Sequence, residues 1–347
     1  MSGLLELGLD TFGDVTLGSD GAPQPLARVI REVIEQGEAA DVAGVHFIGL
    51  GEHHRADFAI SAPEVVLAAI AARTSRIRLG SAVTVLSSDD PIRVYQRFAT
   101  VDAASNGRAE VILGRGSFIE SFPLFGFDLK DYEKLFEEKL DLFATVLRND
   151  VVNWQGSVRS PVQKQKVFPR PESETLKVWI GVGGSPESII RAVQYEMPLM
   201  LAIIGGDPAR FKPYVDLYHR GFAQMGKPVL PVGVHSHGYV AETDAQAREE
   251  LWPDYKGMRD RIGRERGWPP FTTHEFEREI ASGSLYVGSP ETVARRIAKT
   301  ATLLGLSRFD IKYSAGTLSH AKILRCIDLY GRKVIPLVHE MIAKQNA

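Results

Sequence analysis

Short apolar runs alternate along the chain with longer segments whose apolar residues recur at helical spacing. In residues 24–43 and 131–149 the apolar positions fall at i, i+3, i+4 and i+7, which indicates amphipathic helices. Eight runs are typical of β-strands, at residues 5–12, 45–50, 77–85, 109–114, 177–182, 199–204, 232–241 and 308–314. Because strands that alternate with helices form parallel sheets with right-handed crossovers, eight such units predict an α/β fold, a closed (β/α)8 TIM barrel.

Several helix starts and ends carry a chemical signal. Ser61 followed by Glu64 predicts a capping box, and Asp90 before Pro91 predicts the start of the next helix. Asn106-Gly107 predicts the turn that ends that helix.

Two segments exceed what a minimal barrel needs. Residues 151–176 contain several prolines and alternating polar residues, which predicts a hairpin or an irregular excursion before the fifth strand. Residues 242–288 are charged and aromatic and separate the seventh strand from the eighth. An insertion of that length often forms a lid or a pocket wall, so we expect it to cover a site. No linker divides the chain, and we expect one domain over residues 1–347.

Composition narrows the class of protein. The chain is 44% hydrophobic and 24% charged with a formal net charge of −2, which is typical of a globular protein and gives no sign of a nucleic-acid or membrane partner. Cys326 is the only cysteine, so neither an intramolecular disulfide nor a thiolate zinc site can form. The first residues lack the pattern of a signal peptide and no run is long enough to span a membrane, so we expect a cytoplasmic protein.

The stretch Glu52-His53-His54 follows the second predicted strand, where the catalytic groups of a TIM barrel lie. In extended chain, Glu52 and His54 would point to one face and His53 to the other, so one metal ion could not take all three. No other His, Asp or Glu stands at a spacing that would complete a metal shell, and we predict no metal site. Two interpretations remain: polar residues that end a strand, or an imidazole that acts as general acid or base because its pKa lies near neutrality.

A glycine-rich stretch follows the fifth predicted strand. Gly183-Gly184-Ser185 precede Pro186, so Ser185 is the expected N-cap of a helix whose free N–H groups could bind a phosphate. This is no dinucleotide fingerprint, because the frame counted from Gly181 puts Pro186 where the third glycine belongs. The alternative is an ordinary capped helix start, which residues 288–292 repeat in this chain.

Two further stretches lie at strand ends. Arg115 follows the fourth predicted strand and could bind a phosphate, although a solvated arginine is equally common there. Residues 80–88 are mostly small, which would leave room for a flat ring or only mark a tight corner. Together, an anion site, small residues and an imidazole fit a phosphorylated planar cofactor.

Four motifs resemble the bacterial luciferase-like, flavin-dependent monooxygenase family. They read GEHH at 51–54, RIRLGSAVTVLSSDDPIRV at 76–94, FATVDAASNGRAEVILGRGS at 98–117 and VWIGVGGSPES at 178–188. The resemblance spans most of residues 5–225 and the final strand–helix unit. It implies a TIM barrel, commonly a homodimer, that uses FMN in its reduced form together with O2.

The resemblance also implies roles for single residues. His53 takes the place of the family's catalytic histidine, and a non-proline cis peptide is expected at Ala82–Val83 beneath the flavin ring. The residues expected to contact the cofactor are Ala82, Val83, Thr84, Arg115, Gly183, Gly184 and Ser185. Two departures stand out. The luciferase has an acidic residue and a serine where this chain has Gly183-Gly184, and its reactive cysteine before the arginine is Gly114 here.

The leading functional hypothesis is an FMN-dependent monooxygenase that oxidises a small organic molecule such as an aldehyde, a ketone or an alkane-like compound. No NAD(P)H fingerprint is present, so a separate reductase is the expected source of reduced flavin. The alternatives are a deazaflavin-dependent oxidoreductase on the same barrel, a non-catalytic flavin-binding protein and, more remotely, a metal-dependent hydrolase.

Overall fold

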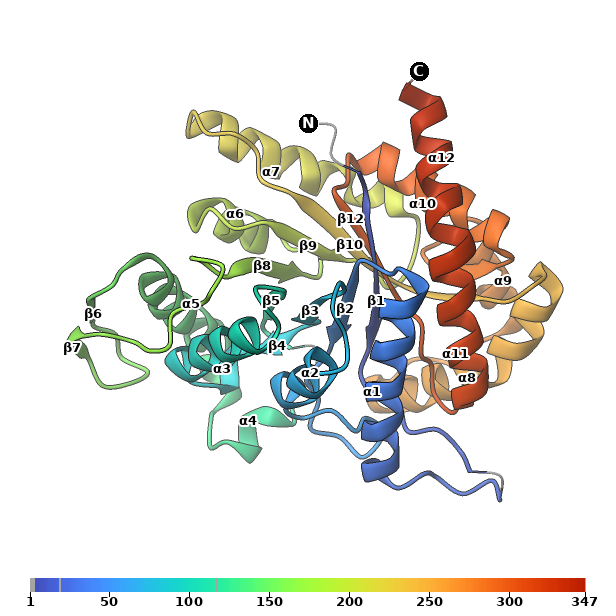
Figure 1. Ribbon diagram of the computed structural model, residues 1–347, viewed down its shortest axis with the longest axis horizontal. Coiled ribbons are helices and arrows are strands. Elements are labelled where there is room, and N and C mark those ends of the chain that lie inside the picture. The colour runs from blue at the N-terminus through green and yellow to red at the C-terminus, as the bar shows by residue number, and fades with distance from the viewer. Residues whose placement is uncertain (1–3, 19, 117, 347) are drawn as a thin grey trace.

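Eight parallel strands close into a barrel in the computed structural model, which describes residues 4–18, 20–116 and 118–346 (Figure 1). Each strand pairs with the next, and the last pairs with the first. The strands are β1 (Glu6–Thr11), β2 (Phe47–Leu50), β3 (Arg78–Ser81), β5 (Ala109–Gly114), β8 (Lys177–Val182), β9 (Leu199–Ala202), β10 (Val232–Val240) and β12 (Arg308–Lys312). The predicted TIM barrel is confirmed.

The prediction of one continuous third strand is wrong. The structure divides residues 77–85 into β3 and a short β4 (Thr84–Val85) that pairs with β5. Between them the Ala82–Val83 peptide bond is cis, at the expected position. The backbone N–H of Val85 donates to the Glu52 carboxylate, 2.8 Å away, and this side-chain bond holds the displaced segment against the second strand.

Helices surround the barrel and bury their apolar faces against it (Figure 1). The long ones are α1 (Leu26–Ala43), α2 (Pro63–Ala71), α3 (Pro91–Ala104), α5 (Tyr132–Arg148), α6 (Pro186–Gln194), α7 (Lys212–Gln224), α10 (Pro290–Leu304), α11 (His320–Leu329) and α12 (Ile335–Asn346). Shorter turns are η1 (Leu86–Ser88), α4 (Ser121–Leu124), η2 (Leu129–Asp131), η3 (Pro208–Phe211) and η4 (Tyr330–Val334). Helices α1 and α5 fall within the two segments predicted from periodicity.

The predicted helix ends have mixed outcomes. Asp90 caps α3 by accepting hydrogen bonds from two backbone N–H groups, and Asn106 and Gly107 both take positive φ in the turn after it, as predicted. The capping box at Ser61–Glu64 is wrong. The N-cap of α2 is Ala62, one residue later, and no side chain caps that helix.

The inside of the barrel is layered along its axis. A charged layer of residues from the strand starts closes the amino-terminal end; it consists of Glu6, Arg78, Glu110, Lys177 and Arg308. Above it lies an apolar layer, separate from the core between strands and helices, formed by Phe47, Ile112, Trp179 and Met200. These two layers seal one end of the barrel, and the carboxyl ends of the strands form the other.

Both predicted insertions are confirmed. Residues 151–176 contain an antiparallel hairpin of β6 (Val152–Trp154) and β7 (Val162–Gln165). Residues 242–288 contain α8 (Asp244–Arg266), α9 (Thr273–Ala281) and β11 (Tyr286–Gly288), which adds to the edge of β10. In Figure 1 the hairpin and these two helices lie on opposite sides of the barrel.

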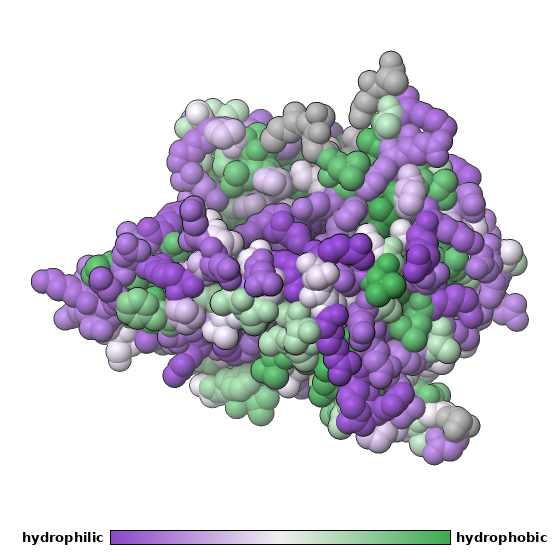
Figure 2. Space-filling model, in the orientation of Figure 1, coloured by the Kyte–Doolittle hydropathy of each residue, from purple (hydrophilic) through white to green (hydrophobic). Residues whose placement is uncertain are grey.

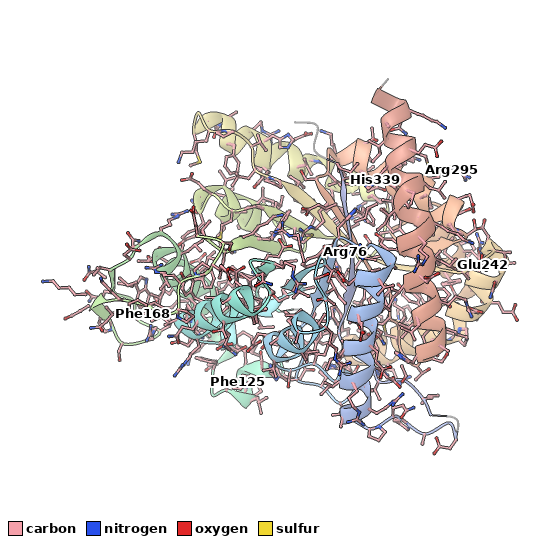
Figure 3. The ribbon with its side chains drawn as sticks, viewed as in Figure 1. Arg76, Phe125, Phe168, Glu242, Arg295 and His339 are labelled. Atoms are coloured by element: carbon pink, nitrogen blue, oxygen red, sulfur yellow. The ribbon has the colours of Figure 1, made fainter. Side chains whose placement is uncertain are left out.

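The surface offers no broad apolar area on the face drawn in Figure 2, where apolar residues lie in small separate groups among polar ones. Two exposed aromatic side chains, Phe125 and Phe168, lie apart at the periphery (Figure 3). Among the described helices, none has the length and apolar character needed to cross a membrane.

Candidate active site

A cavity of about 350 Å³ opens at the carboxyl ends of the barrel strands, a volume within the range of small-molecule sites. Of the residues singled out from the sequence, five line it: His53, Ala82, Val83, Arg115 and Gly183. Thr84, Gly184 and Ser185 are not among its lining residues. The structure therefore brings together most of the predicted site from four separate segments of the chain.

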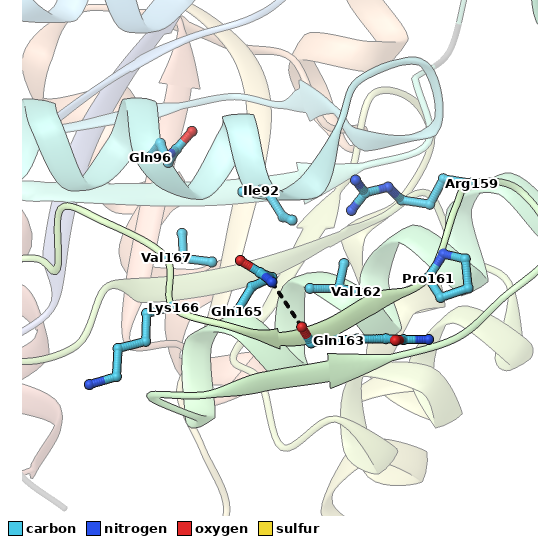
Figure 4. Close-up of a pocket in the computed structure, with 9 residues that line it drawn as sticks. All are labelled: Ile92, Gln96, Arg159, Pro161, Val162, Gln163, Gln165, Lys166 and Val167. Carbon is cyan, nitrogen blue, oxygen red and sulfur yellow. Dashed lines mark hydrogen bonds between the residues drawn. The ribbon is translucent and has the colours of Figure 1, made fainter.

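A second hollow of about 540 Å³ lies between α3 and residues 159–167. Figure 4 shows Ile92 and Gln96 of α3 facing this segment, in which the Gln165 side chain donates to the Gln163 carbonyl oxygen at 2.9 Å. No predicted site residue lines the hollow and no carboxyl end of a barrel strand reaches it. We therefore place the candidate active site in the barrel cavity.

His53 projects into the barrel cavity among aromatic rings. Its ring centroid lies 4.4 Å from that of Phe12, 4.7 Å from Phe58 and 5.2 Å from Phe118. Burial, reinforced by the nearby ammonium of Lys312, lowers the pKa of His53 to about 3. The expectation of a pKa near neutrality is wrong, and at pH 7 the ring is neutral. Neither ring nitrogen has a hydrogen-bond partner within the part of the chain that the structure describes, which leaves both available to a ligand.

Glu52 and His54 support the site, as alternation predicted, and their side chains meet each other. Glu52 Oε1 lies 2.9 Å from His54 Nε2, and the backbone N–H of Glu52 donates to the Val83 carbonyl oxygen at 3.1 Å. With the bond from Val85, these contacts fix residues 82–85 beside the cavity. Glu52 is thus a positioning residue, although it also touches the cavity itself.

Val83, on the cavity lining, fits closely between two glycines. A Cβ on Gly114 would lie 2.6 Å from a methyl of Val83, and one on Gly181 would lie 2.9 Å from the other methyl. Any side chain at these glycines would push Val83 from its place. Thr84 points elsewhere: it is buried, and its hydroxyl has no hydrogen-bond partner among the described residues.

A candidate anion-binding set surrounds Arg115, which lines the cavity. Arg115 forms an ion pair with Glu133 and also donates to Ser188 Oγ at 3.4 Å. The Ser185 hydroxyl donates to the same Ser188 Oγ at 2.8 Å. Ser185 occupies the N-cap position of α6 as predicted, but its side chain does not cap the helix, so the first N–H groups of α6 stay free. Ser117 of the neighbouring motif lies outside the described residues.

The two similar helix starts differ in this respect. Ser289, in the repeated pattern at 288–292, accepts a hydrogen bond from the Thr292 backbone N–H and is an ordinary N-cap. Gly184 takes a φ of 107° and packs near Phe211, so its part in the site is to shape the loop. Ser188 was not predicted; its only signal was its position one helical turn after Ser185.

Sequence reasoning missed the wall opposite His53. His235 Nδ1 lies 2.5 Å from Asp10 Oδ2, and Lys312 is paired with Asp14 at 2.8 Å. His237 also lines the cavity, its Nδ1 is buried without a partner among the described residues, and burial lowers its pKa well below the usual value. The signal was available, because two histidines two residues apart in a strand point to one face.

The insertion supplies the last wall. Met258, Arg259 and Ile262 of α8, which we call the α8 wall, line the cavity, and Trp268 lies beside them at the mouth. The expectation that residues 242–288 cover a site is confirmed. Within the described residues, no group of three or more His, Cys, Asp or Glu side chains could hold a metal ion.

Comparison with solved structures supports the fold. Monooxygenase RslO1 from Streptomyces bottropensis superposes with a TM-score of 0.82 at 20% identity, over 96% of this chain and 99% of that one. The FMN complex of the oxygenating constituent of 3,6-diketocamphane monooxygenase from Pseudomonas putida gives 0.77 at 15% identity, over 96% and 98%. An F420-dependent secondary alcohol dehydrogenase, in complex with an F420–acetone adduct, gives 0.74 at 15% identity, over 97% and 99%.

Sequence comparison identifies the family. The uncharacterized protein y4vJ of Sinorhizobium fredii is 24% identical over 94% of this chain and 97% of its own length. An alkanal monooxygenase alpha chain from a Kryptophanaron alfredi symbiont is 24% identical over 67% of this chain and 65% of its own. The model of the luciferase-like monooxygenases matches residues 11–307. This chain therefore belongs to the luciferase-like monooxygenase family.

Proposed function

We propose that this protein is an FMN-dependent monooxygenase that uses reduced flavin and O2 to oxidise a small organic substrate such as an aldehyde, a ketone or an alkane-like compound. The observation that carries the proposal is that Arg115, the small residues at Ala82–Val83 and the imidazole of His53 line one cavity. The family's monooxygenases, and the FMN complex with a similar fold, support it.

The residues present fit FMN. A phosphate needs several donors, and the Arg115 guanidinium, which lines the cavity, lies beside the Ser188 and Ser185 hydroxyls at the start of α6. A planar ring needs space free of side chains, and Gly114 and Gly181, which also line the cavity, add no side chain beside Val83. When bound, reduced FMN supplies the electrons with which O2 is activated.

The chain's own part is to bind, orient and protect. Arg115 holds the phosphate end, and Glu52 keeps residues 82–85 in place beside the ring. Three phenylalanine rings exclude water from the space around His53: Phe12, Phe58 and Phe118. Without this exclusion, the oxidant would react with water instead of with the substrate.

His53 acts as a neutral hydrogen-bonding group. With a pKa of about 3, its imidazole carries one N–H and one lone pair at neutral pH. It can hold a proton on one nitrogen and accept a hydrogen bond at the other without becoming charged. This suits the orientation of a reacting oxygen atom. It differs from general base catalysis, in which the imidazole would take up a proton and become charged, because the lowered pKa disfavours the charged form.

The proposal includes two partners. A separate flavin reductase would supply reduced FMN, since the sequence carries no NAD(P)H fingerprint, and a second copy of the chain would form a homodimer.

A cofactor exchange experiment tests the proposal. The purified protein is titrated with FMN and with F420, and oxygen uptake is measured with each reduced cofactor and a panel of aldehydes, ketones and alkanes. FMN binding with substrate-dependent oxygen uptake is expected. Tight F420 binding with hydride transfer and no oxygen uptake would instead favour the deazaflavin-dependent oxidoreductase, a class that includes one of the similar structures. Binding of FMN without turnover of any substrate in the panel would indicate a non-catalytic flavin-binding protein.

A further inference from the structure

One cation of the cavity has no anionic partner. Arg259 lines the cavity from α8, and its guanidinium makes no ion pair or hydrogen bond within the described part of the chain. Its Nε atom is buried and unpartnered. Arg115 and Lys312, which line the same cavity, are paired with Glu133 and Asp14. Arg259 thus differs from both in having no ion pair among the described residues, although its charge helps, after hydrogen bonds from Thr272, to lower the pKa of Glu275.

Aromatic rings, rather than carboxylates, fix the position of Arg259. Its guanidinium carbon lies 5.1 Å from the centroid of the Trp268 ring and 5.0 Å from that of Phe271. Stacking of this kind orients a planar, weakly hydrated cation and leaves its N–H groups free for an anion. The side chain is therefore held in place without using its charge.

The neighbours of Arg259 on the cavity are mostly apolar, and the one further cation beside it among the described residues is Arg266, which stacks on the same Trp268 ring. Met258 and Ile262 flank it on α8, and Phe58 and Phe118 lie on the cavity wall near His53. A molecule that filled this space would bury an apolar body and place one anionic group at the guanidinium. A charged group in apolar surroundings is retained at a cost to stability where a ligand pairs with it.

We propose that the substrate is an apolar carboxylic acid, bound with its carboxylate on Arg259 and its apolar body against Met258, Ile262 and the phenylalanine rings. A guanidinium presents paired N–H groups that match a carboxylate in a bidentate contact. The anion-binding set at Arg115, with its hydroxyls and helix terminus, suits a phosphate, so the two ends of the cavity recognise different anions. This inference rests on the proposed function for the identity of the cofactor, but the carboxylate site stands on Arg259 alone.

Matched ligand pairs test the site. Binding of octanoate and octanamide, and of 3-phenylpropanoate and 3-phenylpropanamide, is measured by calorimetry on the protein without flavin and by the visible spectrum of the FMN-loaded protein. The variants are Arg259→Gln, Arg259→Lys and, as a control with the same charge change on the exposed side of α8, Arg264→Gln. A thermal melt of each variant checks that it is folded.

We expect at least one acid to bind the wild type and the control about tenfold or more tightly than its amide, since hydrogen bonds to charged groups contribute at that level. Arg259→Gln should abolish the preference, and Arg259→Lys should keep part of it. Equal binding of acid and amide, no binding of either, or an equal loss in the control would overturn the inference. If FMN fails to bind while the preference persists by calorimetry, the proposed function fails and the carboxylate site stands. If FMN turns over without an acid preference, only this inference fails.

Discussion

Both ends of the barrel carry charged and polar side chains, but they differ in how fully these side chains are paired with one another. At the amino-terminal end, Arg308 is fully buried and paired with Glu6 and Glu110, and Glu110 also accepts a hydrogen bond from the Trp179 indole at 2.8 Å. At the carboxyl end, the imidazole of His53 and Nε of Arg259 have no partners among the described residues. The charged side chains at the amino-terminal end are paired with one another, although Arg308 Nη1 has no hydrogen-bond partner among the described residues. At the carboxyl end, His235 and Lys312 are paired, whereas His53 and Arg259 are not, within the part of the chain that the structure describes.

This difference separates stability from function within one fold. Polar groups that are buried and fully paired maintain the structure, and removing one partner leaves an uncompensated charge. Polar groups left unpaired on a cavity weaken the fold slightly and are completed by a ligand. Four predictions test the contrast, and the largest effect is expected at the closed end.

Glu110→Gln should reduce the free energy of unfolding by about 3–5 kcal/mol, because it breaks a buried ion pair with Arg308. Although burial opposes ionisation, Arg308, Arg78 and Lys177 hold the pKa of Glu110 at about 2, so the carboxylate is charged at all working pH values. Urea denaturation measures the effect. The matched change Glu133→Gln removes an exposed carboxylate at the open end and should cost below about 1 kcal/mol. Equal losses for the two variants would erase the contrast between the ends.

His53→Ala should leave FMN binding near the wild-type value and reduce oxygen-dependent turnover at least tenfold, since removing one positioned hydrogen-bond donor from an active site typically costs about 10²-fold or more. Turnover is followed by oxygen uptake with reduced FMN, and binding by flavin absorbance. His339→Ala, which changes a histidine bonded to the Leu5 carbonyl oxygen away from the cavity, is the control. Unchanged turnover in His53→Ala would remove His53 from the chemistry.

Arg115→Gln should weaken FMN binding by about 10- to 100-fold, because charge-assisted hydrogen bonds to a phosphate are lost. Riboflavin, which lacks the phosphate, should bind the variant and the wild type alike. Fluorescence titration with both flavins gives the comparison, and Arg93→Gln on the exposed face of α3 serves as control. A parallel loss of riboflavin binding would show that Arg115 shapes the loop rather than holding the phosphate.

His53 should also impose a pH dependence on stability. Its pKa is about 3 in the folded protein and near 6.5 when unfolded, so the unfolded chain binds the proton first as pH falls. The stabilisation is complete above pH 6.5 and is lost as pH falls from 6.5 toward 3, with a slope of at most about 1.4 kcal/mol per pH unit. The difference in unfolding free energy between wild type and His53→Asn should follow this course. A difference that stays constant with pH would mean that the imidazole is not buried.

The strand-end rule explains why part of the site could be predicted. Hydrophobic periodicity located the eight strands, and the residues just after them include His53, Arg115 and Gly183, which the structure brings to one cavity. The pKa of His53 could not be predicted, because it depends on rings from three separate segments.

Other parts of the site depended on contacts between distant segments. His235 and His237 stand two residues apart in a predicted strand, but nothing local showed that this face borders the cavity rather than the sealed interior. Arg259 belongs to an insertion whose helix could have packed anywhere around the barrel. The break between β3 and β4 at Ala82–Val83 could not be predicted from the local sequence. The hydrogen bond that holds the segment after it comes from the side chain of Glu52, which is distant in the sequence.

Isotope labelling tests most directly whether the protein uses reduced FMN to transfer an oxygen atom from O2 to its substrate. Reduced FMN, ¹⁸O2 and a substrate panel are combined with the protein, and the products are analysed by mass spectrometry alongside His53→Ala. We expect a product that carries one ¹⁸O atom and forms with reduced FMN. Its yield should be strongly reduced in the variant. A product formed only with reduced F420 and free of ¹⁸O would contradict this expectation.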